Sequence, residues 1–475
     1  MIKINLFCVF IILFQINIYR SFGINDTIPI NNNIKLDPST EFYLIKKIKV
    51  EGNKRTKRDI IIRELSINEG DKLNKSKTIE IIEEEKRKLV NTNLFNEVEI
   101  KIKLVNNDEI EILINLVESL YVLPSIIFEL SDRNFNDWWE NFNHDLSRIN
   151  YGAGLMHYNL SGRADVLEFS FRGGFIKELY SSYYIPYISK KQKGGLEFDF
   201  NLIDYDHLNF ETNNHVPIFY KSKNSLQKEI ISSIEYSHRE SFYNYHYFII
   251  EHNNFEINDT LKALNEKYFF DSNMINSLNI GYEFDRDFRD IKNYPLNGFR
   301  LNNQIKKNGL GIFDDINKWK TKIYYSNYFS LKNKTYFSFN FSSLYSSKNQ
   351  PFLLYESLDK IRGFEKYLIN GYSYLTFRNT LKRNIFSKTY SRDNNKFIKR
   401  VKNVPLSVYF KMFYDSGYIW KYKNQNNTNF LNNKYIYSYG IGFDLVTLKN
   451  ISFSSELSRN SLNEFNLSFN LGADF

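Results

Sequence analysis

The stretch LEFDFNL, from Leu196 to Leu202, alternates apolar and polar residues at every position. A repeat of two indicates a β-strand, because successive side chains of a strand point to opposite faces of the sheet. One face of this segment carries only leucine and phenylalanine, and the other carries only glutamate, aspartate and asparagine. The same alternation returns in DVLEFSFR, TYFSFNFSSL, YSYGIGFDL and the final FNLSFNLGADF. The pattern predicts a large antiparallel β structure.

Segments of this kind fill the chain over residues 121–475. A soluble sandwich also alternates, but we would expect shorter strands and tighter turns in it. Here the segments run to about 10 residues, with Phe, Tyr and Leu on one face and Asp, Asn, Ser, Arg and Gly on the other, which is typical of a transmembrane β-barrel. In lipid every backbone polar group has to be paired within the sheet, so the sheet must close. We predict a 16-stranded antiparallel barrel with strands at 122–130, 148–157, 164–172, 179–187, 195–203, 228–238, 243–253, 277–287, 298–307, 320–330, 334–345, 372–383, 404–414, 435–446, 450–458 and 465–475.

The connections between these strands alternate between long and short ones. The long ones, 204–227, 254–276, 346–371 and 415–434, all fall on one side of the barrel, which faces outward if the N-terminal domain lies in the periplasm. The connection 384–403 breaks the alternation, because it is long and basic and falls on the periplasmic side. A missed pair of strands and an insertion are both open interpretations of it.

Residues 1–23 have the pattern of a secretory signal peptide, with a basic residue, an apolar run from Leu6 to Phe14 and small residues at cleavage positions. The single cysteine, Cys8, lies inside this segment, so the exported chain is expected to contain no disulfide. Residues 24–43 are polar and are expected to form a linker.

Residues 44–118 follow a β-α-α-β-β pattern, which predicts one small α+β domain ahead of the barrel. Thr56 stands where it could cap the first helix. The second helix is predicted over 75–90, and two strands flank the turn Asn106–Asp108. The residues expected along one face of the second helix are Ile79, Ile82, Lys86 and Leu89.

The net charge of +9 does not indicate a nucleic-acid partner, because the lysines and arginines are scattered and concentrate in predicted turns. The sequence contains no P-loop, no G-x-S-x-G and no H-E-x-x-H motif, so we expect neither enzyme activity nor a cofactor. Trp138 and Trp139 are more typical of an interfacial aromatic belt than of a ligand cage. A group around one predicted hairpin is better explained by exposed aromatic-rich strands than by a metal site; it consists of His238, Glu240, His246, Glu251 and His252.

Two short motifs stand in a characteristic order in the barrel segment. The first reads V/I-R-G-F/Y inside the connection 346–371, and the second reads F-x-D-x-G in a later strand. The matching residues are Ile361, Arg362, Gly363 and Phe364 in the first, and Phe413, Asp415 and Gly417 in the second. Residues 44–118 resemble a POTRA domain at VEGNKRTKRDIIIREL, EGDKLN and NTNLFNEVEIKI. Nearly the whole chain resembles the BamA-type outer-membrane protein insertases, and SDRNFNDWW resembles their short, single-POTRA members from Bacteroidetes-type bacteria.

The resemblance implies that the sixth outer loop folds back into the barrel. There Arg362 would form a bidentate pair with Asp415, Gly363 would permit a close approach to the wall, and Phe364 would pack the loop down. Family members often carry a glutamate in the strand after this loop. YSYLTFRNTLKR contains no carboxylate, so Asp415 is expected to be the sole partner of Arg362.

The resemblance also implies an insertase of the outer membrane that is not an enzyme, with its POTRA domain in the periplasm. The POTRA sheet edge would accept an extended client segment by strand addition, and the barrel would open laterally between its first and last strands. Pro124 removes a hydrogen-bond donor from that seam. The expected seam residues are Pro124, Ile126, Phe128, Phe469, Gly472 and Phe475, with Gly472 facing inward and Ile126, Phe128, Phe469 and Phe475 facing lipid.

The expected partners are unfolded outer-membrane β-barrel proteins, accessory lipoproteins, periplasmic chaperones and outer-membrane lipids. Phe475, with alternating aromatics before it, resembles the targeting signal of barrel proteins, although a last strand that ends in the aromatic girdle would look the same. Two other functions stay open. A two-partner secretion pore shares the barrel and its motif but typically has two POTRA domains and a plug helix, and a passive porin needs no POTRA domain at all.

Overall fold

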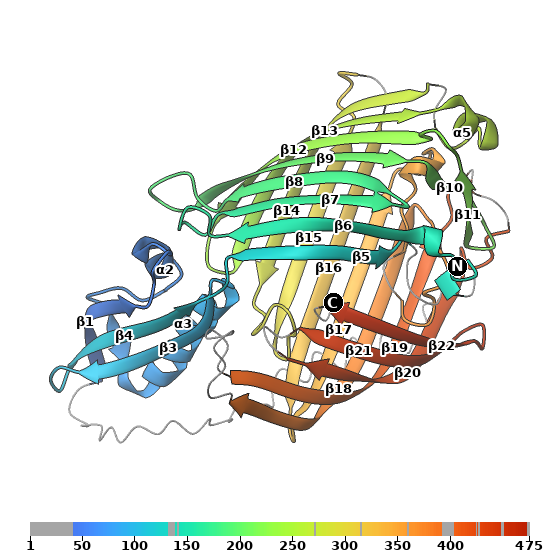
Figure 1. The fold of residues 1–475 in the computed structure, drawn as a ribbon. Coiled ribbons are helices and arrows are strands. Elements are labelled where there is room, and N and C mark those ends of the chain that lie inside the picture. The colour runs from blue at the N-terminus through green and yellow to red at the C-terminus, as the bar shows by residue number, and fades with distance from the viewer. Residues whose placement is uncertain are drawn as a thin grey trace, which may run out of the picture.

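The computed structural model describes residues 41–131, 138–139, 142–269, 272–313, 316–358, 361–391, 403–423, 425, 428–447 and 451–472. The predicted signal peptide, most of the predicted linker and Phe475 lie outside the described residues. A small α+β domain stands at one end of a curled 16-stranded antiparallel sheet (Figure 1). The predicted fold class is therefore confirmed. Among the described residues, no helix is both long enough and apolar enough to cross a membrane.

The N-terminal domain pairs a four-stranded sheet with two α-helices. Its elements are β1 (Phe42–Glu51), α2 (Arg58–Arg63), β2 (Lys72–Asn74), the 3-10 turn η1 (Lys75–Lys77), α3 (Thr78–Asn91), β3 (Phe95–Leu104) and β4 (Glu109–Glu118). The strand order is β2-β1-β4-β3, with β1 parallel to β4 and β3 antiparallel to it. The three-residue strand β2 was not predicted, and the last two residues of the predicted linker belong to β1.

Alternation in β4 builds the core of this domain, because Ile110, Ile112 and Ile114 are fully buried beneath the helices. Two details differ from the prediction. Thr56 does not cap α2, because the N-cap position of this helix is Lys57. The hydroxyl of Thr56 instead donates a hydrogen bond to Glu118 (2.8 Å). The buried face of α3 is turned by one residue, so that Ile79 is 60% exposed; the buried residues are Thr78, Ile82, Glu85 and Leu89.

The barrel sheet runs in chain order from β5 to β22, and each strand is antiparallel to the next. Its strands are β5 (Val122–Leu130), β6 (Ile149–Tyr158), β7 (Val166–Gly174), β8 (Lys177–Ile185), β9 (Gly194–Tyr205), β12 (Gln227–Arg239), β13 (Asn244–Ile257), β14 (Met274–Asp287), β15 (Gly298–Asn308), β16 (Lys318–Leu331), β17 (Thr335–Ser346), β18 (Ser373–Ser391), β19 (Asn403–Trp420), β20 (Tyr435–Val446), β21 (Ser452–Asn460) and β22 (Phe465–Gly472). Each predicted strand overlaps one of these.

The connection 384–403, which the sequence analysis left open between a missed strand pair and an insertion, is described only at its two ends, because residues 392–402 lie outside the described residues. Both of its ends continue the neighbouring strands, because β18 extends to Ser391 and β19 begins at Asn403. The ladder between the two strands runs on to the pair Ser391–Asn403. The segment was misjudged because a β-bulge between Asn384 and Phe386 breaks the alternation there.

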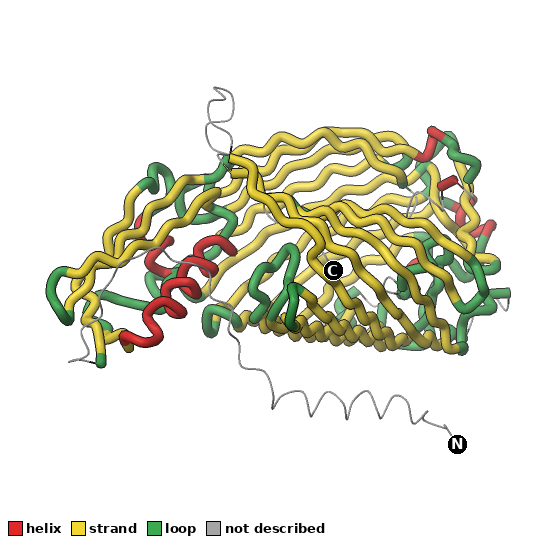
Figure 2. The backbone as a smooth tube through the Cα atoms, turned by 90° about the horizontal axis from the view of Figure 1, so that it is seen from below, coloured by secondary structure: helices red, strands yellow, loops and turns green. Residues whose placement is uncertain are grey.

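The long outer connections form a cover over one end of the barrel, opposite the N-terminal domain (Figure 2). They contain the hairpin β10 (His207–Asn213) and β11 (Val216–Lys221), the helix α5 (Asp259–Leu264), and the 3-10 turns η2 (Leu146–Arg148) and η3 (Phe352–Leu354). Buried apolar residues beneath this cover include Leu208, Leu226 and Leu261. The hairpin β10–β11 is a separate two-stranded sheet outside the barrel wall.

The N-terminal domain docks against the periplasmic turns of the first half of the barrel. Arg239, at the end of β12, donates two hydrogen bonds to Glu64 (2.8 and 2.7 Å). Tyr243, in the following turn, donates to Glu84 (2.5 Å). Lys88 of α3 lies over the ring of Phe242, with 4.5 Å from its Nζ atom to the ring centroid. These contacts fix the domain beneath one side of the barrel.

Candidate functional site

The sixth outer loop, between β17 and β18, turns into the barrel, and Arg362 meets Asp415 of β19. The Arg362 Nε atom donates to Oδ2 of Asp415 (2.8 Å), and its Nη2 atom donates to Oδ1 (2.6 Å). The backbone N–H of Arg362 also donates to Oδ2 (3.1 Å). Asp415 is completely buried. It lies well inside β19 rather than at its end, so the arginine is held in a fork by the wall itself.

A second carboxylate, which the sequence analysis missed, completes the surroundings of Arg362. The Nη1 atom of Arg362 lies 3.5 Å from Oε1 of Glu456 on β21. Thr380 of β18 accepts a hydrogen bond from Nη2 (3.0 Å). The ring of Phe413 lies beneath the guanidinium, with 3.9 Å from its Cζ atom to the ring centroid. The expectation that Asp415 is the sole partner of Arg362 is therefore wrong.

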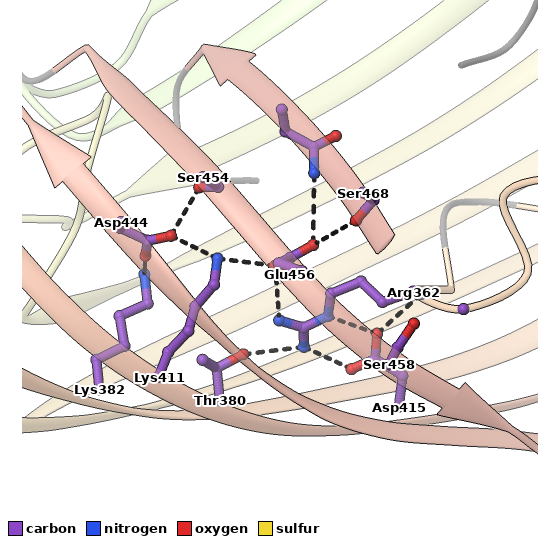
Figure 3. Close-up of polar contacts among 12 residues, drawn as sticks. Arg362, Thr380, Lys382, Lys411, Asp415, Asp444, Ser454, Glu456, Ser458 and Ser468 are labelled. Atoms are coloured by element: carbon purple, nitrogen blue, oxygen red, sulfur yellow. Dashed lines mark hydrogen bonds and ion pairs between the residues drawn. The ribbon is translucent and has the colours of Figure 1, made fainter. Parts of the chain in front are cut away.

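Glu456 joins Arg362 to a larger ionic network on the inner wall (Figure 3). Lys411 of β19 bridges Glu456 (2.7 Å) and Asp444 of β20 (2.5 Å). Lys382 of β18 lies 3.8 Å from Asp444. The network therefore contains three cations and three carboxylates, all buried or nearly so, and its formal charge balances. A buried charge left without its partner is strongly destabilising, so each member depends on the others.

Hydrogen bonds extend this network to the last strand. Ser468 and Asn470 of β22 each lie 3.4 Å from Oε2 of Glu456. Ser454 donates to Asp444 (2.7 Å), and the hydroxyl of Tyr294 donates to it from the turn before β15 (2.8 Å). The sequence feature that could have indicated Glu456 as a member of the network is the inward-facing polar row of β21, which includes Ser454, Glu456 and Ser458.

Small residues make room for the loop against the wall. Gly363 has φ +85°, in the left-handed region that favours glycine, and a Cβ there would lie 3.1 Å from the Ser458 hydroxyl and 3.2 Å from Cβ of Ser438. Gly417 lies under the loop as well, since a Cβ there would come within 2.6 Å of the Ile361 side chain. Phe364 is buried in a cluster with Ile369 and other apolar residues.

The residues after the motif fasten the loop to the hairpin β21–β22. Asn460, at the end of β21, donates to the carbonyl of Gly363 (2.8 Å). Glu365 accepts hydrogen bonds from the backbone N–H of Gly363 (2.7 Å) and from the side chain of Asn466 on β22. Tyr367 donates to Glu464 in the turn between the two strands (2.9 Å). The loop is thus bound to the pair of strands that ends the sheet.

The predicted seam residues lie on the two edges of the sheet. Ile126 and Phe128 of β5 are 91% and 75% exposed on the outer face, and Phe469 of β22 is 54% exposed. Pro124 also lies in β5, and Gly472 ends β22. The sequence analysis expected these strands to close the barrel, but among the described residues no pairing joins β5 to β22. The missing N–H donor of Pro124 weakens any ladder that could form at this edge of β5.

The cover on the outer side is attached to the same loop through one buried histidine. The tip of the β10–β11 hairpin places His215 where its carbonyl accepts from Leu368 N–H (2.7 Å) and its Nε2 atom accepts from Leu431 N–H (2.8 Å). Burial lowers the pKa of His215 to about 4. Burial, together with the charge of Arg148, also lowers the pKa of His207 to about 4 at the base of the hairpin. Both histidines are therefore neutral at pH 7.

The candidate metal ligands do not converge on one point. His238 and His246 are opposite each other on β12 and β13. Glu251 instead accepts hydrogen bonds from Lys306 in the lumen (2.8 Å). In the described part of the chain, no group of three His, Cys, Asp or Glu side chains is arranged to hold a metal ion.

Comparisons with known proteins agree with this architecture. Residues 43–119 match the family model described as POTRA, surface antigen variable number repeat. No curated protein sequence matches the chain. The structure of BamA from Haemophilus ducreyi lacking POTRA domains 1–3 is similar, at 17% identity over 92% of this chain and 86% of that one, with a TM-score of 0.51. CdiB from Escherichia coli is similar at 13% identity over 91% of this chain and 76% of that one, with a TM-score of 0.54.

At 17% and 13% identity, both likenesses show the fold alone. The matched model covers the N-terminal domain and not the barrel. The 16-stranded sheet with its outward apolar face places the barrel in the outer membrane, with the POTRA-type domain on its periplasmic side. The chain thus has a fold like those of BamA and CdiB, with one POTRA-type domain followed by a 16-stranded β-barrel.

Proposed function

We propose that the protein is an insertase that folds β-barrel proteins into the outer membrane through a lateral seam between β5 and β22. The observation that carries this proposal is the state of the sheet edges. Both β5 and β22 have a strand on one side only among the described residues. The edge strand of a sheet offers N–H and C=O groups with which a new strand can pair. In lipid such an edge is costly, and a client hairpin would relieve that cost.

The loop contacts support a role for the ionic network in positioning the seam. Arg362 is anchored to β19, and the residues that follow it hold Asn460 and Asn466 of the last hairpin. Glu456 contacts both Arg362 and β22. We propose that these contacts act as a latch that keeps the β21–β22 edge in place while clients pair with it.

The POTRA-type domain offers a second place for strand addition. Its edge strand β3 has β4 on one side and no strand on the other among the described residues. Strand addition would use backbone hydrogen bonds, so it would accept clients of differing sequence. In this proposal the domain delivers an extended segment to the periplasmic end of the seam. Client folding supplies the free energy, because no nucleotide is available in the periplasm.

A two-partner secretion pore is the main alternative. The fold does not decide between the two functions, because the TM-score to CdiB, 0.54, is close to the TM-score to BamA, 0.51. In such a pore the substrate passes through the lumen, so the loop around Arg362 would have to leave it. A passive porin agrees less well, because it needs neither the docked domain nor the loop in the lumen.

Depletion of the protein followed by proteomics of the outer membrane tests the proposal. Loss of an insertase should lower the abundance of many β-barrel proteins together, because they share one assembly route. Loss of a secretion pore should affect one exported protein, and loss of a porin should affect solute uptake. An outer-membrane proteome that is unchanged apart from the depleted protein would contradict the insertase assignment.

A further inference from the structure

The two strands β18 and β19 reach farther into the periplasm than their neighbours do (Figure 1). The neighbour β17 stops pairing with β18 at Arg383, and β20 stops pairing with β19 at Ser407. Beyond these points the strand pairing of β18 and β19 within the described residues is with each other alone, as far as Ser391 and Asn403. We call this two-stranded extension, residues 384–391 and 403–406, the periplasmic ribbon.

The bulge at the root of the ribbon decides which side chains face outward. Its extra residue is Ile385, because Asn384 pairs with Tyr409 and Phe386 pairs with Val408. Directly opposed residues share one face of a sheet. Val408 stands four residues before Met412 in β19, so its side chain is on the same face as that of Met412, which faces lipid. The bulge therefore turns Phe386 to the outer face of the ribbon.

The ribbon has one apolar face and one polar face. The outer face consists of Phe386, Lys388 and Tyr390 on β18 and Leu406 and Val404 on β19, and Val408, where the ribbon leaves the barrel sheet, faces the same way. The other face carries Ser387 and Thr389 on β18 and Pro405 on β19, and the hydroxyl of Ser387 is hydrogen-bonded to that of Ser407 across the strands (2.9 Å). Both Phe386 and Tyr390 are exposed. Exposed aromatic side chains that lie together on one face of a ribbon indicate a surface that another molecule or a membrane covers.

We propose that the outer face of the periplasmic ribbon lies in the headgroup region of the periplasmic leaflet of the outer membrane. Two observations favour a lipid surface. The apolar row of β19 continues without interruption from the lipid-facing belt into the ribbon, through Met412, Phe410, Val408, Leu406 and Val404. The second observation is a cation beside an aromatic ring, since Lys388 lies over Tyr390 at 5.0 Å from its Nζ atom to the ring centroid.

This pairing of residue types suits the membrane interface. Tyrosine places its ring among the headgroups and its hydroxyl in water, and a lysine there is attracted by anionic lipids. The ribbon would then fasten the wall that carries the ionic network to the membrane, on the opposite side from the docked POTRA-type domain. A protein partner is the other candidate occupant, but an extended peptide would pair with the free edges of the ribbon and leave its outer face open. The inference does not depend on insertase activity.

Site-directed labelling of the full chain in vesicles tests the proposal. The one cysteine of the sequence, Cys8, lies in the predicted signal peptide. A single cysteine introduced into the ribbon can therefore carry a spin label without interference. Labels at Phe386, Lys388 and Tyr390 sample the outer face, and labels at Ser387, Thr389 and Ser407 sample the other face. Ile250 on the lipid-facing side of β13 serves as the reference for lipid, and the exposed Lys101 of β3 serves as the reference for water. The probes are dissolved oxygen, which concentrates in lipid, and a water-soluble nickel chelate.

The proposal predicts that accessibility alternates along β18. Positions 386, 388 and 390 should resemble Ile250, with several-fold more collisions with oxygen than with nickel, and positions 387 and 389 should resemble Lys101. Adding phosphatidylglycerol to phosphatidylcholine vesicles should strengthen the contrast, and Lys388→Glu should remove that increase. Equal access of nickel to all positions of the ribbon would overturn the proposal. Protection of the outer face only after an added protein client is supplied would also overturn it, in favour of a protein-docking surface.

Discussion

Ile361 of the inward-folded loop occupies the space in which a side chain at position 417 would stand. An ideal Cβ built on Gly417 lies 2.6 Å from the Ile361 Cδ1 atom and 3.1 Å from the carbonyl oxygen of Leu375. Gly417 stands two residues after Asp415, the carboxylate that holds Arg362. The same strand therefore holds the arginine and makes room for the residue before it, which explains physically why the two motifs go together.

The first prediction is that Gly417→Ala loosens the loop, because the new methyl group would push the end of the Ile361 side chain out of its buried position. Overpacking of this kind typically costs about 1–3 kcal/mol. Limited proteolysis of the folded protein should cut the loop around Ile361 faster in the variant. The matched control is Gly281→Ala, where the nearest atom is a side-chain carbon of Ile249 at 3.5 Å, an ordinary contact. Equal cleavage rates in the two variants would show that Ile361 is not held against Gly417.

The second prediction concerns the buried ion pair. Arg362→Ala and Asp415→Asn should each destabilise the barrel, and breaking a buried pair costs about 3–5 kcal/mol, reduced where water enters the lumen. The double variant should be much less harmful than the sum of the two, because the residues are coupled. The exposed pair Arg172–Glu129 (2.7 Å) is the control and should contribute no more than about 1 kcal/mol. Denaturation in urea, followed by the gel mobility of the folded barrel, measures the free energy of unfolding of these variants and of the control variants. Additive losses at Arg362 and Asp415 would show that the pair does not act as a unit.

The third prediction follows from the two buried histidines of the outer cover. Because the folded pKa values of His215 and His207 are lowered to about 4 from 6.5, the packed hairpin is fully stable above pH 6.5. As the pH falls from 6.5 toward 4, the released hairpin binds more protons than the packed one, so stability is lost by up to about 1.4 kcal/mol per pH unit for each histidine.

Hydrogen exchange of residues 207–221 at pH 7.5 and at pH 5, corrected for intrinsic rates, measures this loss. Exchange should be faster at pH 5 in the natural chain. The variant His215→Gln should respond less to pH, and adding His207→Gln should remove most of the remaining response. An unchanged pH response in the double variant would assign the effect to other groups.

The sequence was sufficient for the barrel because each side chain in a membrane strand meets either lipid or the lumen. This alternation located all sixteen strands, whereas the family resemblance carried by the two motifs was what brought Arg362 and Asp415 together. Helical periodicity failed at α3, where Ile79 is an apolar residue in water, and alternation failed at Asn384, where a bulge changes which side chains face outward. It also missed Glu456, because a partner on the wall is determined by strand register, which alternation alone does not give.

The fourth prediction concerns the docked domain. Deletion of residues 44–118 should leave a barrel that still inserts into the outer membrane but no longer assembles clients, because the edge of β3 at which we propose strand addition is lost. Glu64→Ala is a milder variant that leaves the domain in place and breaks its bidentate contact with Arg239. It should change client assembly less than the deletion does. An undiminished outer-membrane proteome in the deletion strain would count against the proposed insertase.

The central claim, lateral opening between β5 and β22, is tested most directly by locking the seam. Cysteines placed at the inward positions Ser125, Ile127 or Glu129 are combined with cysteines at Asn466, Ser468 or Asn470, since opposed residues about 4.5–5.5 Å apart are within disulfide reach. A matched control locks two strands that already pair, with cysteines at Asp199 and Ser233. We predict that one seam pair cross-links, that the locked protein stops inserting clients, and that reductant restores insertion, while the control stays active throughout. Full insertion activity with the seam quantitatively cross-linked would contradict lateral opening and favour transport through the lumen.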